Sequence, residues 1–294
     1  MSTKDTSRLP LKPLAALAAL VLLVAPAFAE PEKEGGKPKV ETATFKSGGK
    51  RVAVECSKPT KPGKYPAVVL LHAVDGIDAT WGPLYRDLAA EYAGRGYVVV
   101  LVHYYDRTDP DKKERVGYRD LFVNHFTRKE VPRKEQERMT ALFGAWGEAV
   151  RDAVAYARSR PEVDRDRVGL VGFSLGASLA LAAAAEHDLK LACLVELFGA
   201  LPREHRGRVR EMPPTLIIHG DADAVVPVEE AYLLAGLLLA RKQRPEVEVL
   251  AGAEHMFLKD GKTLQRWPLA VAKMKVDAFL TLHLGEKRVA KAAP

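Results

Sequence analysis

The chain has 294 residues, of which 47% are hydrophobic and 28% are charged. This composition is that of a globular protein, and it excludes disordered and collagen-like chains. Two cysteines are too few for a disulfide framework or a cysteine-rich zinc site. The net charge of +7 suggests nucleic-acid binding, but residues 203–210 are basic without interleaved aromatic residues, and residues 128–138 mix basic with acidic side chains. Both stretches are typical of solvated surfaces, so we expect no nucleic-acid partner.

The first 29 residues have the pattern of a secretory signal peptide. Basic residues precede an apolar run over residues 14–24, and Ala27-Phe28-Ala29 supplies the small residues that an export peptidase recognises. As a helix, the apolar run would span about 16 Å, which is too short for a stable membrane span. We therefore predict export, periplasmic or secreted, after cleavage near Ala29. An uncleaved anchor and a merely amphipathic start are the alternatives.

A polar leader over residues 30–41 precedes the first structured elements. Residues 42–45 and 51–56 flank Ser47-Gly48-Gly49 and predict a β-hairpin, because alternating residues bracket a glycine turn. Continuous apolar runs and segments with helical spacing then follow one another along the chain. We expect strands over residues 67–72, 97–102, 167–173, 191–198, 215–219 and 247–250, and helices over residues 81–93, 145–158, 175–185, 228–240 and 269–282.

This alternation predicts one α/β domain over residues 42–285, with a mostly parallel central sheet covered by helices on both faces. Residues 108–143 are polar, with few core signals. We expect them to form a partly helical insertion that lies over one end of the sheet and could act as a lid. A basic tail follows over residues 286–294. Ligands of such sheets bind at the carboxyl ends of the strands, so motifs at those ends matter most.

Gly172-Phe173-Ser174-Leu175-Gly176 matches the G-x-S-x-G pattern of a nucleophile elbow. A buried strand leads into the motif and an apolar helix leaves it. Such a tight turn would present the serine hydroxyl at the helix N-terminus, where the helix dipole favours negative charge. An ordinary serine N-cap is the alternative. The context favours Ser174 as a catalytic nucleophile.

A serine nucleophile needs a base to take its proton and an acid to orient that base. Asp223, on the loop after the strand expected over residues 215–219, is the favoured acid, with Asp221 and Glu196 as alternatives. His255, just after the last short strand, is the candidate base. The chain order of serine, aspartate and histidine is the order used by α/β-hydrolases.

The tetrahedral intermediate of such a reaction needs N–H donors for its oxyanion. We expect them from the backbone of Leu175, which follows the nucleophile, and of Val74, in the loop after the first buried strand. His72 and His219 stand at strand ends and are expected to be structural hydrogen-bonding groups. Gly261-Lys262-Thr263 lacks the upstream glycine of a phosphate loop, and no other nucleotide- or metal-binding motif occurs. No cofactor and no metal are therefore predicted.

The cysteines are candidates for buried thiols. Cys193 lies inside an apolar, strand-like run, and Cys56 ends the second strand of the expected hairpin. An oxidising compartment would permit a bridge between Cys56 and Cys193, but we expect both to be buried and free.

Taken together, these motifs resemble the dienelactone hydrolase family of the α/β-hydrolase superfamily, over about residues 42–284. The resemblance implies an α/β-hydrolase fold and a hydrolase of esters or lactones. The founding enzymes use a cysteine nucleophile and place a glutamate in the oxyanion loop, where this chain has Ser174 and Ala73, so a serine-nucleophile member without a thiol switch is implied. The motifs that carry the resemblance are Leu71-His72-Ala73-Val74-Asp75-Gly76, Arg160-Pro161-Glu162-Val163-Asp164, the elbow, Phe198-Gly199-Ala200, the 223–227 loop and Gly252-Ala253-Glu254-His255.

The resemblance also implies two cationic residues for substrate binding. In the family, two arginines can hold a substrate carboxylate. Arg107 matches one of them, and Lys259 stands where the other would be. Ordinary surface charge is the alternative for both.

We therefore predict an exported serine hydrolase that cleaves a carboxylic ester or lactone through a Ser-His-Asp triad and an acyl-enzyme. Its partner would be a small-molecule ester or lactone. A serine peptidase of the same fold and a catalytically silent binding protein are the alternatives. The sequence makes no prediction of oligomeric state.

Overall fold

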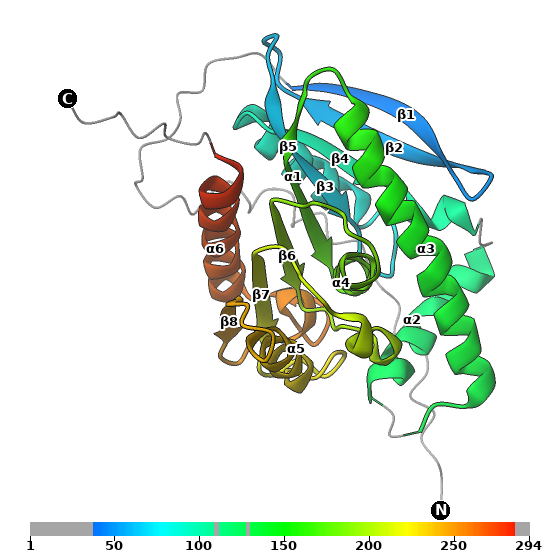
Figure 1. The fold of residues 1–294 in the computed structure, drawn as a ribbon. Helices are drawn as coiled ribbons and strands as arrows, with labels where there is room; N and C mark the ends of the chain where they lie inside the picture. Colours follow the sequence, from blue (N-terminus) through cyan, green and yellow to red (C-terminus); the bar gives the residue numbers. More distant parts are fainter. Residues whose placement is uncertain (1–37, 109–111, 128–129, 286–294) are drawn as a thin grey trace, which may run out of the picture.

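The computed structural model describes residues 38–108, 112–127 and 130–285 (Figure 1). The predicted signal peptide, most of the predicted leader and the basic tail lie outside these described residues. Among the helices of the described ranges, none has the length and apolar character needed to cross a membrane.

An eight-stranded sheet forms the centre of the described part of the chain, in the order β1-β2-β4-β3-β5-β6-β7-β8. The strands from β4 to β8 in this order are parallel, and β1 and β2 are antiparallel to their neighbours. The apolar runs seen in the sequence form the parallel strands, because such strands are buried on both faces. The bounds are β1 (Lys39–Ser47), β2 (Lys50–Lys58), β3 (Tyr65–Leu71), β4 (Val98–Val102), β5 (Val163–Phe173), β6 (Cys193–Leu197), β7 (Thr215–Gly220) and β8 (Glu246–Leu250).

The predicted hairpin is present as β1 and β2, and it is longer than the sequence suggested. Gly48 and Gly49 form a two-residue turn with φ values of 48° and 79°, a conformation that glycine adopts without strain. The predicted leader extended too far, since β1 already begins at Lys39. Glu41 lies within β1 and pairs with Lys58 at 3.1 Å and with Arg160, and these ion pairs help to hold the start of the strand on the sheet.

Helices cover both faces of the sheet, as predicted (Figure 1). Successive strand residues point to opposite faces, so Val69 and Leu71 belong to one core and Val68 and Leu70 to the other. The first core is closed by α2 (Lys112–Thr127), α3 (Arg133–Ser159), α4 (Leu175–Glu186) and α5 (Glu229–Leu239). The second core is closed by α1 (Gly82–Gly94) and α6 (Arg266–Leu284).

The segment expected to be a polar insertion contributes more to the core than predicted. It contains α2 and the first part of α3, which is one continuous helix rather than a helix that begins at residue 145. Tyr118, Phe122 and Phe126 are buried along one stripe of α2, and Phe143 is buried on α3. The spacing of four residues between Tyr118, Phe122 and Phe126 places these three on one face of α2. The charged residues between them concealed this pattern, and movement as a lid stays a prediction.

Both cysteines are buried and free, as predicted. Cys56 belongs to the core on one face of the sheet, and Cys193 belongs to the core on the other. The sheet itself therefore separates the two thiols. Burial raises the pKa of the Cys193 thiol to about 12.

Candidate active site

The predicted elbow connects β5 directly to α4 through a strained serine. Ser174 has φ 52° and ψ −112°, a left-handed value of φ that is costly for a non-glycine residue. A Cβ atom at Gly172 would lie 2.5 Å from the backbone nitrogen of Ala177, and one at Gly176 would lie 2.5 Å from the carbonyl oxygen of His72. Ser174 makes no side-chain capping hydrogen bond to α4, so its hydroxyl is not used as an N-cap.

Three side chains from three strand ends meet at this turn. Ser174 Oγ lies 2.9 Å from His255 Nε2, and His255 Nδ1 lies 2.7 Å from Asp223 Oδ2. Ser174 and Asp223 are buried. The carboxyl ends of parallel strands lie along one edge of the sheet, which brings together residues that are far apart in the sequence. The distances are those of a nucleophile, a base and an orienting acid.

Of the three candidate acids, Asp223 is the one that contacts His255. Its other oxygen, Oδ1, accepts the backbone N–H groups of Val225 and Val226 at 2.8 and 2.9 Å. Asp221 Oδ1 instead accepts the N–H of Gly252 at 2.6 Å, which is the role of a turn residue.

His219 lies behind Asp223 and between two carboxylates. Its Nε2–H donates to the carbonyl of Val226 at 2.9 Å and lies 3.5 Å from Asp223 Oδ2. Its Nδ1 lies 3.8 Å from Glu196 Oε1, and Glu196 Oε2 accepts the N–H of Gly199. The side chains of His219 and Glu196 are wholly buried. His219 thus makes the predicted structural hydrogen bond, and it also lies beside Asp223, the candidate acid.

The neighbouring charged groups shift the pKa of both His219 and Asp223. Burial lowers the pKa of His219, but the carboxylates of Asp223 and Glu196 overcome this effect and raise it to about 10. Burial opposes the charge of Asp223, but hydrogen bonds from His219 and His255 hold the pKa of this carboxyl well below its ordinary value. Asp223 is therefore an anion over the whole physiological range of pH, as an acid that orients a histidine must be.

The two predicted oxyanion donors lie in the loop after β3 and at the start of α4. Leu175 is the first residue of α4, so its N–H has no acceptor within the helix. The loop that carries Val74 is fixed on both sides, because the Ala73 N–H donates to the Tyr85 hydroxyl at 2.8 Å and the Tyr105 hydroxyl donates to the Val74 carbonyl at 2.6 Å. Such fixed donors are the kind that stabilise an oxyanion.

Three other predicted residues have different surroundings. His72 is buried, and its Nδ1 lies 2.7 Å from the carbonyl oxygen of Ala73, as expected of a structural hydrogen-bonding group. The Arg107 guanidinium packs on the hairpin turn at Gly48 and pairs with Glu148 at 2.9 Å, so its charge already has a carboxylate partner. Lys259 is exposed on the short strand β9 (Leu258–Lys259). Substrate binding by Arg107 or Lys259 stays a prediction.

Two further residues at the site were quoted from the sequence only as parts of motifs that carry the resemblance, with no role of their own. Phe198 follows β6 with φ 46°, and its ring contacts the His255 ring edge-on at 5.3 Å between centroids. Asp75 lies in the same loop as Val74, where desolvation raises the pKa of its carboxyl against the opposing charges of Arg119 and His255. The signal for Phe198 was its position, because β6 lies next to β5 and ends at the same edge of the sheet.

A metal centre has no ready set of ligands at this edge. Within residues 38–108, 112–127 and 130–285, no cluster of three or more histidine, cysteine, aspartate or glutamate side chains is arranged to hold a metal ion.

Comparison with known proteins finds a family that matches most of this chain. Residues 52–282 match the dienelactone hydrolase family. A Synechocystis sp. protein provisionally named carboxymethylenebutenolidase is 26% identical over 141 residues, which are 47% of this chain and 50% of that protein. The chain thus matches half the length of this relative. A Bradyrhizobium sp. protein provisionally named 2-oxo-3-(5-oxofuran-2-ylidene)propanoate lactonase is 25% identical over 249 residues, 79% of this chain and 90% of that protein.

Solved structures share the fold. A dienelactone hydrolase-like promiscuous phosphotriesterase from metagenomic libraries superposes with a TM-score of 0.67 at 19% sequence identity. The superposition covers 85% of this chain and 100% of that one. The architecture is therefore the α/β-hydrolase fold that the motifs predicted.

Proposed function

This chain belongs to the dienelactone hydrolase family of ester-bond hydrolases, and we propose that it is an exported serine hydrolase that cleaves a carboxylic ester or lactone through an acyl-enzyme. The observation that carries the proposal is the continuous contact from Ser174 Oγ through His255 to Asp223, with distances of 2.9 and 2.7 Å. The names of the two curated relatives, one of which is a lactonase, favour a small ester or lactone as the substrate. The export part rests on the N-terminal sequence alone.

The first half of the reaction forms the acyl-enzyme. Ser174 Oγ attacks the carbonyl carbon while His255 Nε2 takes the hydroxyl proton, and Asp223 stabilises the resulting imidazolium. The carbonyl oxygen becomes an oxyanion that the N–H groups of Val74 and Leu175 bind. The intermediate collapses by breaking the bond to the alcohol oxygen, which leaves with the proton from His255.

The second half restores the enzyme. A water molecule attacks the acyl carbon as His255 Nε2 takes its proton, and the same two N–H groups bind the second oxyanion. Breaking the bond to Ser174 Oγ releases the carboxylic acid, and His255 returns the proton to the serine. For a lactone, the alcohol and the acid are parts of one ring-opened product.

Hydrolysis of p-nitrophenyl acetate and butyrate tests the nucleophile. Ser174→Ala is expected to lower kcat by up to about 10⁶-fold, by analogy with other triad enzymes. Ser159→Ala is the matched control, because Ser159 is exposed and bonds to Tyr156 within the same helix, and its activity should equal that of the unchanged chain. Equal activity in the Ser174→Ala variant would refute the mechanism.

The alternative functions have separate outcomes. Digestion of casein by the unchanged chain but not by the Ser174→Ala variant would indicate a peptidase. Absence of both ester and peptide hydrolysis, together with no reaction of Ser174 with a fluorophosphonate, would indicate a silent binding protein. Export is tested by N-terminal sequencing of the chain recovered outside the cytoplasm of a bacterial host, where a start at Glu30 is expected and retention of residues 1–29 would contradict cleavage.

A further inference from the structure

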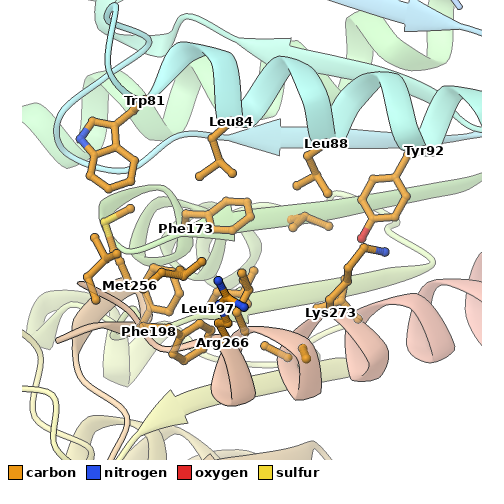
Figure 2. A pocket seen from close by; sticks show the side chains of 18 residues that line it. Trp81, Leu84, Leu88, Tyr92, Phe173, Leu197, Phe198, Met256, Arg266 and Lys273 are labelled. Carbon is orange, nitrogen blue, oxygen red and sulfur yellow. The ribbon is translucent and has the colours of Figure 1, made fainter. Parts of the chain in front are cut away.

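An apolar cavity of about 390 Å³ lies beside the triad, between α1 and α6. Figure 2 shows side chains of α1 along one wall, with α6 opposite and Phe173 between them. This volume is within the range of small-molecule sites, which are about 300–1,000 Å³. Apart from Trp81, Tyr92, Arg266 and Lys273, every residue that lines the cavity is apolar.

The cavity lies next to the candidate catalytic residues, although none of their three side chains lines it. Phe173, which lines it, immediately precedes Ser174, and Met256, which also lines it, immediately follows His255. Phe198 both lines the cavity and contacts the His255 ring. The 72–76 loop, which would supply one oxyanion donor, is not part of the lining. The cavity therefore begins on the histidine side of the site and not on the oxyanion side.

The far end of the cavity is polar. Figure 2 places Trp81 and Met256 at one end of the labelled side chains, and Tyr92 and Lys273 at the other. The Lys273 ammonium pairs with Glu91 at 2.6 Å and with Asp277 at 2.7 Å, so its charge is balanced within the protein. The wall from Leu84 to Tyr92 is two turns of helix, about 12 Å long. The cavity thus suits a narrow aliphatic chain of limited length.

The chemistry of the reaction decides which part of an ester such a chain would be. His255 must deliver a proton to the leaving oxygen, so this oxygen faces the imidazole, and the group attached to it continues on the histidine side. Resting on the function proposed above, we infer that the cavity binds the alcohol portion of the substrate, and that the substrates are esters of linear aliphatic alcohols.

A series of acetate esters from ethyl to octyl tests this assignment. All of them form the same acetyl-enzyme, so an effect of chain length must arise while the alcohol is still attached. We expect kcat/KM to rise about fourfold for each added methylene until the chain reaches the end of the cavity. The p-nitrophenyl esters with acyl chains from acetate to octanoate should show no comparable rise.

Filling the cavity should remove the gain. Leu269→Trp on α6 and Leu88→Trp on α1 each place a large ring in it from opposite walls, and the ratio of kcat/KM for hexyl over ethyl acetate should fall at least about tenfold. Leu282→Trp is the matched control, because Leu282 is 71% exposed on the same helix as Leu269 and does not line the cavity. This control should keep the ratio of the unchanged chain.

The outcomes test two separate statements: the assignment of the cavity and the proposed function. A flat acetate series, a rise along the acyl series instead, or an unchanged ratio in both tryptophan variants with native thermal unfolding would overturn the assignment of the cavity. Hydrolysis of ethyl acetate that persists in the Ser174→Ala variant would overturn the proposed function itself. A ratio that falls in both filling variants and not in the control supports the inference.

Discussion

The buried pair of His219 and Glu196 makes a quantitative prediction about stability. Nε2 of His219 carries a proton because it donates to the Val226 carbonyl. Nδ1 then faces Glu196 Oε1 at 3.8 Å, and both atoms are buried without a hydrogen bond. Without a proton on Nδ1, two lone pairs would face each other away from water, which is costly. The pair therefore favours a charged His219 in the folded chain.

The size of the effect follows from the pKa of His219, which rises from an ordinary 6.5 to about 10 on folding. The folded chain holds this proton more tightly than the unfolded chain does. The contribution to stability is therefore complete below pH 6.5 and is lost as the pH rises toward 10. Between about pH 6 and about pH 8.5, the contribution of His219 to the free energy of unfolding should fall by roughly 2–3 kcal/mol. This window stays below 9.0, the ordinary pKa of the cysteine thiols.

Glu196→Gln should remove most of this dependence. The new amide oxygen can still accept the Gly199 N–H, and its NH₂ can donate to Nδ1 of a neutral His219, so the proton is no longer needed. Urea unfolding at the two pH values, with equal m-values, measures the difference. Glu137→Gln is the control, since Glu137 is 62% exposed in a surface pair. Equal losses of stability in the unchanged chain and in the Glu196→Gln variant would refute the assignment of charge to His219.

Two further predictions concern the elbow and the acid. Gly176→Ala forces a Cβ atom to within 2.5 Å of the His72 carbonyl oxygen and should destabilise the fold by about 1–3 kcal/mol or more. Gly144→Ala on α3, where a Cβ atom would meet nothing within 4 Å, should instead stabilise the fold by up to about 1 kcal/mol. Urea unfolding of both variants checks these two changes. Asp223→Asn should lower kcat for p-nitrophenyl acetate by about 10⁴-fold, because the amide favours the wrong tautomer of His255. Asp221→Asn should have little effect on kcat. A large loss of kcat in the Asp221→Asn variant and little loss in the Asp223→Asn variant would make Asp221 the acid.

Much of the fold could be predicted, because its strongest signals are local. The parallel strands appear as continuous apolar runs, and helix α4 follows its strand through a glycine-flanked turn. The order of the strands and the continuity of α3 could not be predicted in this way, because both depend on tertiary packing. The aromatic residues at positions 118, 122 and 126 show the problem, since polar residues separate them in the sequence and their common helix face becomes clear only where α2 packs on α3.

The part of the candidate site that could be predicted is the set of residues that lie at strand ends. Ser174, Asp223 and His255 belong to loops that leave three parallel strands, and one rule about sheet edges brings them together. That rule does not predict which side chains pair with each other in the folded chain. Neither the pairing of Arg107 with Glu148 nor the charge of His219 follows from a motif, because both depend on which side chains the folded chain places next to each other.

The most direct test of the central claim is to identify the residue that a fluorophosphonate modifies. The unchanged chain and the Ser174→Ala variant are treated with the probe, and the modified peptide is located by mass spectrometry. The account predicts one added phosphonyl group, on Ser174, and none in the variant. Modification of a different residue, such as Ser178 on α4, or equal modification of both proteins would contradict it.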